Sequence, residues 1–294
     1  MTYNRRKFLL QGAGLVSGLA LTSFAKSPLI DAVGGFEADA MKAFGLQLWS
    51  VRDDMAKDPK GTLKQLASYG YKQIESFEGK DGIYWGMTAK EFKKYMDSLG
   101  MKLVSSHCDI SKDFEQKAHD AAAIGVKYLI CPWKGPQKSL DDFKKFADEF
   151  NACGEICRKA GIRFAYHNHD YSFKELEGKL PQDLMMENTD AATVDYEMDM
   201  YWVVTAGHDP IEWMKKYPNR FRACHIKDRT RNVGADEKDA SCVLGKGSID
   251  YVKVLKAAKK QGMQYFIVEQ EKFVGTTPML AVKANAGYMK KLKV

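Results

Sequence analysis

Four side chains that can bind a metal each follow a short apolar run in this 294-residue chain. They are His167 in FAYHNHD, Asp199 in ATVDYEMDM, His225 in FRACHIKD and Glu269 in YFIVEQE. Two imidazoles and two carboxylates make a donor set that suits a divalent cation. An ionised carboxylate directly after an apolar strand, such as Glu269, also needs a partner, and a cation is an effective one. The sequence therefore predicts a metal site assembled from four distant segments.

Further ionisable residues lie close to these four in the sequence. Alternate residues of a strand share a face, so we expect His169 beside His167 and Lys227 beside His225. The same alternation places Glu197 deeper than Asp199, together with Asp195, in ion pairs or behind the ligands. The residues assigned to catalysis, as proton-transfer groups or as a cation that stabilises negative charge, are Glu269, His169, His107 and Lys227.

A second group of polar and aromatic residues near strand ends is assigned to substrate binding. Tryptophan rings at such positions could stack on the apolar face of a sugar. The group consists of Glu75, Trp49, Trp133, Trp202 and Asn168. Each assignment has a structural alternative: the rings could simply pack in the core, the histidines could satisfy backbone groups, and Lys227 could pair with Asp228 at the surface.

Short β-rich runs alternate with amphipathic helical patterns along the chain. The predicted strands are 45–49, 72–76, 102–106, 127–131, 162–167, 192–198, 222–226 and 265–269. Predicted helices at 62–69, 88–99, 114–124 and 140–160 are each followed by a glycine suited to a left-handed cap. This alternation indicates an α/β fold, and the number of strands favours a single (β/α)8 TIM barrel. The alternative is a doubly wound open sheet, but no GxGxxG follows the first strand.

The first residues have the form of an export signal rather than of the folded domain. Arg5, Arg6 and Lys7 precede a short run rich in small residues, from Gly12 to Ala25, as in a twin-arginine signal. A transmembrane anchor is the alternative, but the run is short and contains Gly and Ser. We therefore expect 1–33 to be signal and linker, 34–294 to be the barrel, no stable membrane span after signal removal, and a periplasmic protein.

Composition excludes several classes of function. The formal charge of +7 falls to about +4 without the three basic residues of the signal, and the lysines are scattered, so no nucleic-acid partner is expected. The 6 cysteines are too few for a disulfide scaffold, although a single disulfide stays open. The oligomeric state also stays open, with a homo-oligomer among the options.

Several motifs together resemble a known family. YHNHDYSF, CHIKD, GKGSID and VEQE, in this order and spacing, resemble the xylose isomerase-like TIM barrels that include sugar phosphate isomerases/epimerases. The resemblance implies that Asp199, His225 and Glu269 bind a divalent metal. His167 stands where ketose 3-epimerases of this family have a glutamate that takes part in proton transfer, and Trp202 stands where they have a substrate-contacting histidine.

These observations lead to an expected reaction. A divalent ion, namely Mn²⁺, Zn²⁺, Co²⁺ or Mg²⁺, would help a carbohydrate lose a proton next to a carbonyl, and two imidazole ligands disfavour Mg²⁺. We expect a metal-dependent sugar isomerase or epimerase acting through an enediolate on an unphosphorylated sugar or keto-sugar. The alternatives are a lyase that cleaves a 3-keto-glycoside by β-elimination, and a barrel that binds carbohydrate without catalysis.

Overall fold

The computed structural model describes residues 41, 43–234 and 236–294. The export signal and linker expected in 1–33 lie outside the described residues. Within the part described, no helix has the length and apolar character needed to cross a membrane. All six cysteines are free, so the disulfide left open by the sequence is not formed.

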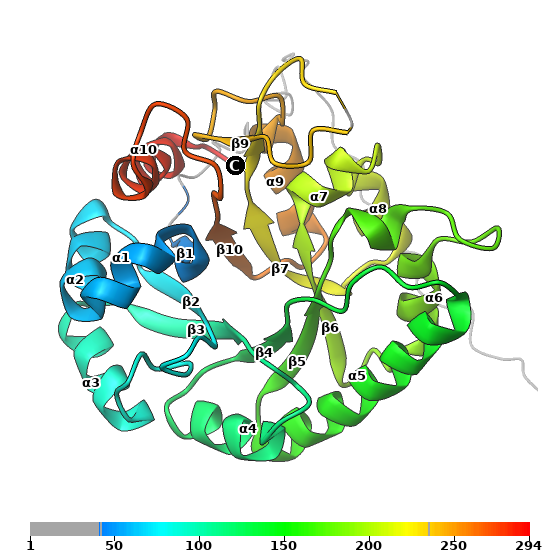
Figure 1. Ribbon diagram of the computed structural model, residues 1–294, viewed down its shortest axis with the longest axis horizontal. Coiled ribbons are helices and arrows are strands. Elements are labelled where there is room, and N and C mark those ends of the chain that lie inside the picture. Colours follow the sequence, from blue (N-terminus) through cyan, green and yellow to red (C-terminus); the bar gives the residue numbers. More distant parts are fainter. Residues whose placement is uncertain (1–40, 42, 235) are drawn as a thin grey trace, which may run out of the picture. The chain divides into compact units, whose positions relative to one another are not determined.

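A closed parallel barrel forms the centre of the molecule, as Figure 1 shows. Each strand pairs with the next along the chain, and β1 closes the ring by pairing with the last strand, Gly45 lying opposite Ile267. The barrel predicted from the sequence is therefore confirmed, and the open-sheet alternative is wrong. The barrel strands are β1 (Gly45–Gln47), β2 (Gln73–Phe77), β3 (Lys102–His107), β4 (Tyr128–Cys131), β5 (Arg163–His167), β6 (Val194–Asp199), β7 (Phe221–Ile226) and β10 (Tyr265–Val268).

Helices surround the barrel and cover the outer faces of its strands (Figure 1). They are α1 (Arg52–Lys57), α2 (Pro59–Tyr69), α3 (Ala89–Ser98), α4 (Phe114–Ala123), α5 (Leu140–Ala160), α6 (Pro181–Asn188), α7 (Met200–Thr205), α8 (Pro210–Lys216), α9 (Tyr251–Lys260) and α10 (Pro278–Lys291). Two 3₁₀ turns, η1 (Leu48–Val51) and η2 (Asp170–Phe173), follow β1 and β5, and a small hairpin pairs β8 (Asp228–Arg229) with β9 (Ser241–Cys242).

Local sequence signals explain where the helices start and stop. Thr88 and Glu91 form a capping box at the start of α3, in which each side chain accepts a hydrogen bond from the other residue's backbone N–H. Ser139 caps α5, and Gly161 ends that helix in the left-handed conformation with φ of 84°. The first strand is shorter than predicted, because the Gln47 side chain accepts a hydrogen bond from Trp49 N–H and turns the chain into η1.

The inside of the barrel changes in character from one end to the other. At the amino end of the strands, the Arg163 guanidinium pairs with Asp195, which also accepts a hydrogen bond from the Tyr128 hydroxyl at 2.8 Å. Ile130 and Ala165 are buried beside Tyr128. At the carboxyl ends the inward-facing residues are instead histidines and carboxylates. Since charged groups are rarely fully buried unless paired, this end is where chemistry is expected.

Candidate active site and metal centre

The four predicted metal ligands meet at the carboxyl ends of adjacent strands. His167 ends β5, Asp199 ends β6, His225 lies in β7 and Glu269 directly follows β10. His167 Nε2 lies 3.1 Å from His225 Nδ1 and 3.5 Å from Asp199 Oδ2. His225 Nδ1 lies 3.7 Å from Asp199 Oδ2 and 3.2 Å from Glu269 Oε2. Parallel strands thus bring together residues that are far apart in the sequence.

The chemistry and spacing of these donors fit a divalent metal. A tetrahedral ion with bonds of about 2.0 Å holds neighbouring donors about 3.3 Å apart, close to the separations of this group. The donor atoms of His167, Asp199 and His225 all lie within 4.8 Å of one another, and these residues could hold an ion. Glu269 contacts this group at His225 Nδ1 and completes a set of two imidazoles and two carboxylates.

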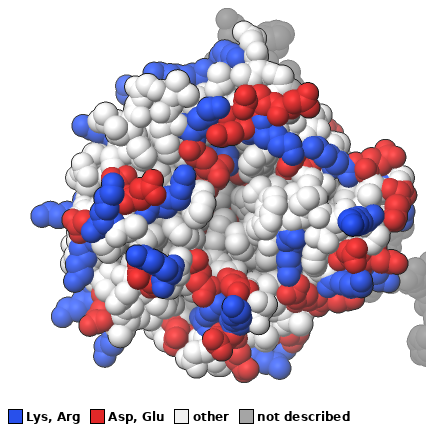
Figure 2. All heavy atoms as spheres, in the orientation of Figure 1, with Lys and Arg blue, Asp and Glu red and all other residues white. Residues whose placement is uncertain are grey.

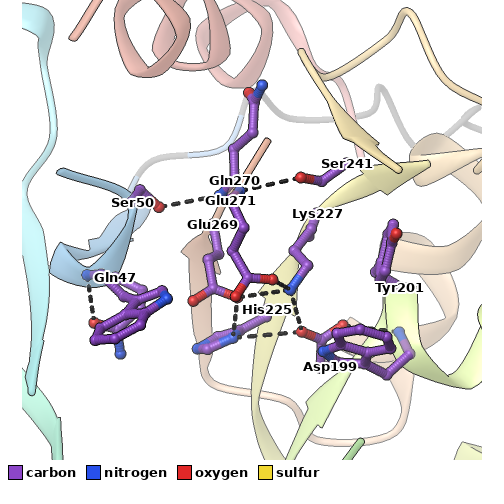
Figure 3. A network of polar contacts seen from close by, with 12 residues as sticks. Gln47, Ser50, Asp199, Tyr201, His225, Lys227, Ser241, Glu269, Gln270 and Glu271 are labelled. Carbon is purple, nitrogen blue, oxygen red and sulfur yellow. Dashed lines mark hydrogen bonds and ion pairs between the residues drawn. The ribbon is translucent and has the colours of Figure 1, made fainter. Parts of the chain in front are cut away.

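A buried lysine lies beside the metal-capable group, as Figure 3 shows. The Lys227 ammonium is 3.1 Å from Glu269 Oε2 and 3.4 Å from Asp199 Oδ2, and it also donates to Glu271. It lies 5.0 Å from the ring centroids of Tyr201 and Trp202, within the range of a cation–π interaction. Burial lowers the pKa of Lys227, but Asp199 and Glu269 outweigh it and hold the pKa well above its usual value. Lys227 is therefore a permanent cation in this site.

The buried charges also bias the other ionisable ligands. Burial raises the pKa of Asp199, but Lys227 and the hydrogen bond with His167 outweigh it, so this pKa lies well below its ordinary value. For Glu269, too, burial is outweighed, by Lys227 and His225, and the pKa is lowered. Both carboxylates are consequently ionised and available as ligands.

A cavity of about 340 Å³ opens above these residues. In Figure 2, one face of the molecule is hollowed near its centre, where the walls are mainly uncharged and charged residues lie further out. The cavity is lined by Trp49, Phe77, Glu78, His107, Cys108, Asp109, Pro132, Trp133, His167, His169, Trp202, Lys227, Glu269 and Glu271. All four residues assigned to catalysis and all three tryptophans assigned to substrate binding thus face one space.

His169 has the surroundings of a neutral base. Its ring lies against Trp133, with centroids 4.5 Å apart, and against Trp202 at 5.4 Å. Burial and the neighbouring His167 lower the pKa of His169 well below its usual value, so the imidazole is uncharged at neutral pH. Its Nδ1 is buried and has no hydrogen-bond partner among the described residues. Because the neutral ring carries a single proton, one of its two nitrogens keeps a lone pair that can accept a proton.

Two residues assigned to substrate binding lie away from the cavity lining. Asn168 is buried and ties two strand ends together, since its amide donates to the Asp199 carbonyl at 3.2 Å and its side-chain oxygen accepts from Asp199 N–H at 3.1 Å. Glu75 lies deeper, where its Oε1 is 2.6 Å from His225 Nε2. Asn168 therefore positions Asp199, and Glu75 contacts the far side of His225.

The structure adds functional residues that the sequence reasoning did not assign. Glu271 binds Lys227 and lines the cavity, and Gln47 donates to Glu75 Oε1 at 2.8 Å. Glu197, which strand alternation placed deeper than Asp199 in ion pairs or behind the ligands, lies 2.8 Å from His107 Nε2 at the level of Glu75. The spacing of two residues between Glu269 and Glu271 is a sequence signal that could have suggested Glu271, whereas no local signal marks Gln47.

A glycine-rich loop at the same end of the barrel is already filled by a side chain. The Asp228 carboxylate accepts hydrogen bonds from the N–H groups of Gly245 and Gly247, at 2.9 Å each, and of Ile249 at 3.2 Å. A Cβ atom on Gly247 would lie 2.1 Å from Asp228 Oδ1, so the close wrap requires glycine there. Backbone N–H groups that could otherwise bind a phosphate are therefore occupied. The structure thus pairs Asp228 with this loop, and Lys227 with the buried carboxylates, instead of with one another.

Known proteins of similar sequence include inosose dehydratases. Inosose dehydratase of Clostridium perfringens is 28% identical over 247 residues, covering 71% of this chain and 81% of that protein. Inosose dehydratase of Lacticaseibacillus casei is 25% identical, covering 71% of this chain and 80% of the relative.

Solved structures show the same barrel. A sugar phosphate isomerase/epimerase from Parabacteroides distasonis is 32% identical with a TM-score of 0.73, covering 89% of this chain and 97% of that one. The IOLI protein, solved with a bound zinc atom, has a TM-score of 0.68 at 15% identity and covers 83% of this chain and 95% of its own, which shows the fold alone. The family model of the xylose isomerase-like TIM barrel matches residues 63–292. The chain therefore belongs to the family of xylose isomerase-like TIM barrels.

Proposed function

We propose that this protein is a metal-dependent lyase that removes a proton next to the carbonyl of an unphosphorylated polyhydroxy ketone or keto-sugar and expels the β-oxygen substituent. The observation that carries the proposal is the neutral imidazole of His169, which faces the cavity beside the His167, Asp199 and His225 donors. A site with an uncharged base beside a metal-capable set suits abstraction of a carbon-bound proton.

The metal would be held by His167, Asp199, His225 and Glu269. When bound, a divalent ion supplies Lewis-acid polarisation of the substrate's carbonyl group, which acidifies the neighbouring C–H. Lys227 contributes a second, fixed positive charge, because the carboxylates around it keep its ammonium protonated. Asn168 holds the backbone of Asp199 and so fixes the direction of that ligand.

His169 then takes the proton from carbon onto a ring nitrogen. The electron pair of the broken C–H bond forms the new carbon–carbon double bond as the β-oxygen leaves, and the protonated His169 returns its proton to that oxygen. A free hydroxyl group leaves as water, and a glycosidic oxygen leaves as the alcohol. The ring walls of Trp133 and Trp202 hold His169 in place and keep bulk water away from it.

An unphosphorylated substrate is supported by the charges around the cavity. Lys227 is the one cationic side chain among the described lining residues other than the histidines, and three carboxylates surround it. The backbone N–H groups of the 245–249 loop bind Asp228 and not a ligand. The same preference fits a periplasmic location, which the twin-arginine form of the first residues would imply, because phosphorylated sugars are chiefly cytoplasmic metabolites.

An isomerase or epimerase is the second candidate, and the likeness to the Parabacteroides distasonis protein supports it. His169 would then return the proton to carbon, either at a neighbouring position or on another face. The histidine at position 167 favours the lyase, because the resemblance places there one of the two glutamates that transfer protons in ketose 3-epimerases. An imidazole that binds metal does not offer the same carboxylate for proton transfer.

The reaction class is tested by incubating the zinc-, manganese- or cobalt-loaded protein with an inosose, with free ketoses and with 3-keto-glycosides in D₂O. Mass spectrometry and NMR would detect loss of water or release of the aglycone, which we expect. Deuterium uptake on carbon without cleavage of the bond to the β-oxygen would contradict the lyase proposal and support the isomerase. If no substrate changes with any metal, the protein is better described as a carbohydrate-binding barrel.

The role of His169 is tested by His169→Gln, which keeps a polar side chain of similar length but removes the base. We expect a loss of at least about 100-fold in kcat with KM little changed. His119→Gln is the matched control, because His119 is exposed on α4, away from the cavity. Equal effects of the two substitutions would remove His169 from the mechanism.

A further inference from the structure

A second group of metal-capable residues lies beneath the first, inside the barrel. It comprises Glu75 on β2, His107 on β3, Glu197 on β6 and His225 on β7, and all four are buried. One donor atom from each lies within 4.8 Å of the other three. His107 also lines the cavity, so it stands between the solvent-accessible space and this inner group.

The inner donors lie at separations close to those of a tetrahedral ligand set, two of them slightly shorter. His225 Nε2 is 2.6 Å from Glu75 Oε1 and 3.3 Å from Glu197 Oε2. His107 Nε2 is 3.3 Å from Glu75 Oε1 and 2.8 Å from Glu197 Oε2. The two imidazoles therefore alternate with the two carboxylates around a small space, as donors around one ion do. Two of the separations equal the about 3.3 Å expected for zinc, and the two shorter pairs, at hydrogen-bonding distance, would open slightly to admit an ion.

Lys227, the buried ammonium of this site, does not contact the inner carboxylates, so within the group only its two histidines can offset their charge. The side chains of Glu75 and Glu197 are both 0% exposed, and the Lys227 ammonium contacts Asp199, Glu269 and Glu271 instead. Glu197 Oε1 is buried and has no hydrogen-bond partner among the described residues. A buried carboxylate oxygen without a partner costs free energy unless a proton or a metal satisfies it.

His225 connects the two groups through opposite sides of its ring. Its Nδ1 faces Asp199 and Glu269, and its Nε2 faces Glu75 and Glu197. We propose that the protein holds a second divalent cation of the zinc type in the inner group, bound by Glu75, His107, Glu197 and the Nε2 atom of His225. The His225 ring bridges the two ions, and on binding the second ion it releases its remaining ring proton to solvent.

A bridged pair has a clear physical advantage over the outer ion alone. Burial of Asp199 and Glu269 above the ring, and of Glu75 and Glu197 below it, concentrates negative charge in a small volume. A second divalent ion offsets this charge and orders the four inner side chains. It also fixes the ring of His225 and therefore the direction of the Nδ1 lone pair toward the outer site.

The competing arrangement is one in which protons occupy the inner group. Burial and the adjacent Glu75 raise the pKa of Glu197 well above its usual value, so a protonated Glu197 could satisfy the same cluster without a metal. In that case His225 keeps its Nε2–H and donates it to Glu75. The two arrangements differ in the number of ions bound per chain.

Metal stoichiometry and ion positions decide between them. Full-length protein is stripped with a chelator, equilibrated with Zn²⁺, dialysed and analysed by elemental mass spectrometry. Anomalous X-ray scattering at the zinc edge then locates the ions in crystals of the same sample. We expect two ions per chain, one on each side of the His225 ring. A single ion on the Nδ1 side would overturn the proposal.

Two substitutions separate the sites. Glu197→Gln should lose the inner ion and keep the outer one, whereas His167→Gln should lose the outer ion and keep the inner one. An unchanged stoichiometry in Glu197→Gln would contradict the proposal even if two ions are bound, because the second would lie elsewhere. If Glu197→Gln does not fold, the anomalous map of the unsubstituted protein still gives the answer. None of these measurements depends on the reaction that the outer site performs.

Discussion

Replacing Lys227 with methionine would measure how much of the negative charge of Asp199 and Glu269 this ammonium balances when no metal is bound. Lys227 is 1% exposed and contacts three carboxylates, two of which, Asp199 and Glu269, are proposed metal ligands. Methionine keeps much of the side-chain volume and removes the charge. Breaking a buried ion pair by removing one partner typically costs about 3–5 kcal/mol, because the remaining charge is left unbalanced.

The expected loss of stability in Lys227→Met depends on whether a metal is bound. In metal-free protein at pH 8 we expect a destabilisation of about 3–5 kcal/mol, which corresponds to a fall in Tm of roughly 6–20 °C for a domain of this size. With Zn²⁺ bound, the ion itself balances Asp199 and Glu269, so the loss should be smaller by about 2 kcal/mol or more. By linkage, a difference of about 2 kcal/mol means that the variant binds zinc about thirtyfold more tightly.

Differential scanning calorimetry with excess EDTA or excess Zn²⁺, together with zinc titration calorimetry, measures both quantities. Lys93→Met is the matched control, because the Lys93–Asp97 pair is exposed and should contribute only about 0.3–0.5 kcal/mol with either addition. Equal losses for Lys227→Met with and without zinc would refute the reasoning. So would a metal-free loss no larger than that of the control.

Three further predictions concern other parts of the structure. Asp228→Asn should lower the free energy of unfolding by about 1.5–3 kcal/mol in urea titrations, since the carboxylate binds several N–H groups of the 245–249 loop; a loss below about 0.5 kcal/mol would contradict this role. Burial raises the pKa of Asp170, but Lys238 and Lys174 outweigh it and hold it below 3.8. The ion pairs of Asp170 therefore stabilise the protein above pH 3.8 and lose their effect as the pH falls through the lowered pKa. Asp170→Asn should lower the free energy of unfolding at pH 7 and lower it progressively less below pH 3.8. A difference between variant and unsubstituted protein that stays constant with pH would argue against the ion pairs. Trp133→Ala should raise KM for a carbohydrate substrate several-fold with a smaller effect on kcat, because the half-exposed ring lines the cavity wall; an unchanged KM would show that the ring does not contact substrate.

Much of the architecture could be read from local patterns. Alternation of β-rich runs with amphipathic helices predicts the parallel barrel, because both periods follow from which side chains must be buried. Gly70, Gly100, Gly125 and Gly161 were expected to end helices, and each has a positive φ. The first strand is the main difference, since the Gln47 side chain turns the chain at Trp49 where composition favours a strand.

The two-residue period of a strand explains why the inward-facing residues could be predicted and why Glu75 was misplaced. Strand alternation places His167 with His169, and His225 with Lys227, on the inward face, as the structure has them. It orders residues by depth within one strand, as for Glu197 and Asp199, but it does not compare the depths of residues on different strands. Glu75 was therefore assigned to substrate binding, although it lies beneath His225.

The sequence by itself determined the barrel, the inward-facing residues and the presence of a metal-capable donor set, because each follows from local patterns that repeat from one strand to the next. Only the tertiary structure decided how residues from different strands share partners: Lys227 among three carboxylates, Asp228 inside the glycine loop, and His225 between two donor groups. These arrangements depend on strand stagger and on distances across the barrel. No local pattern in a chain encodes those distances, since they are set by all the strands closing together.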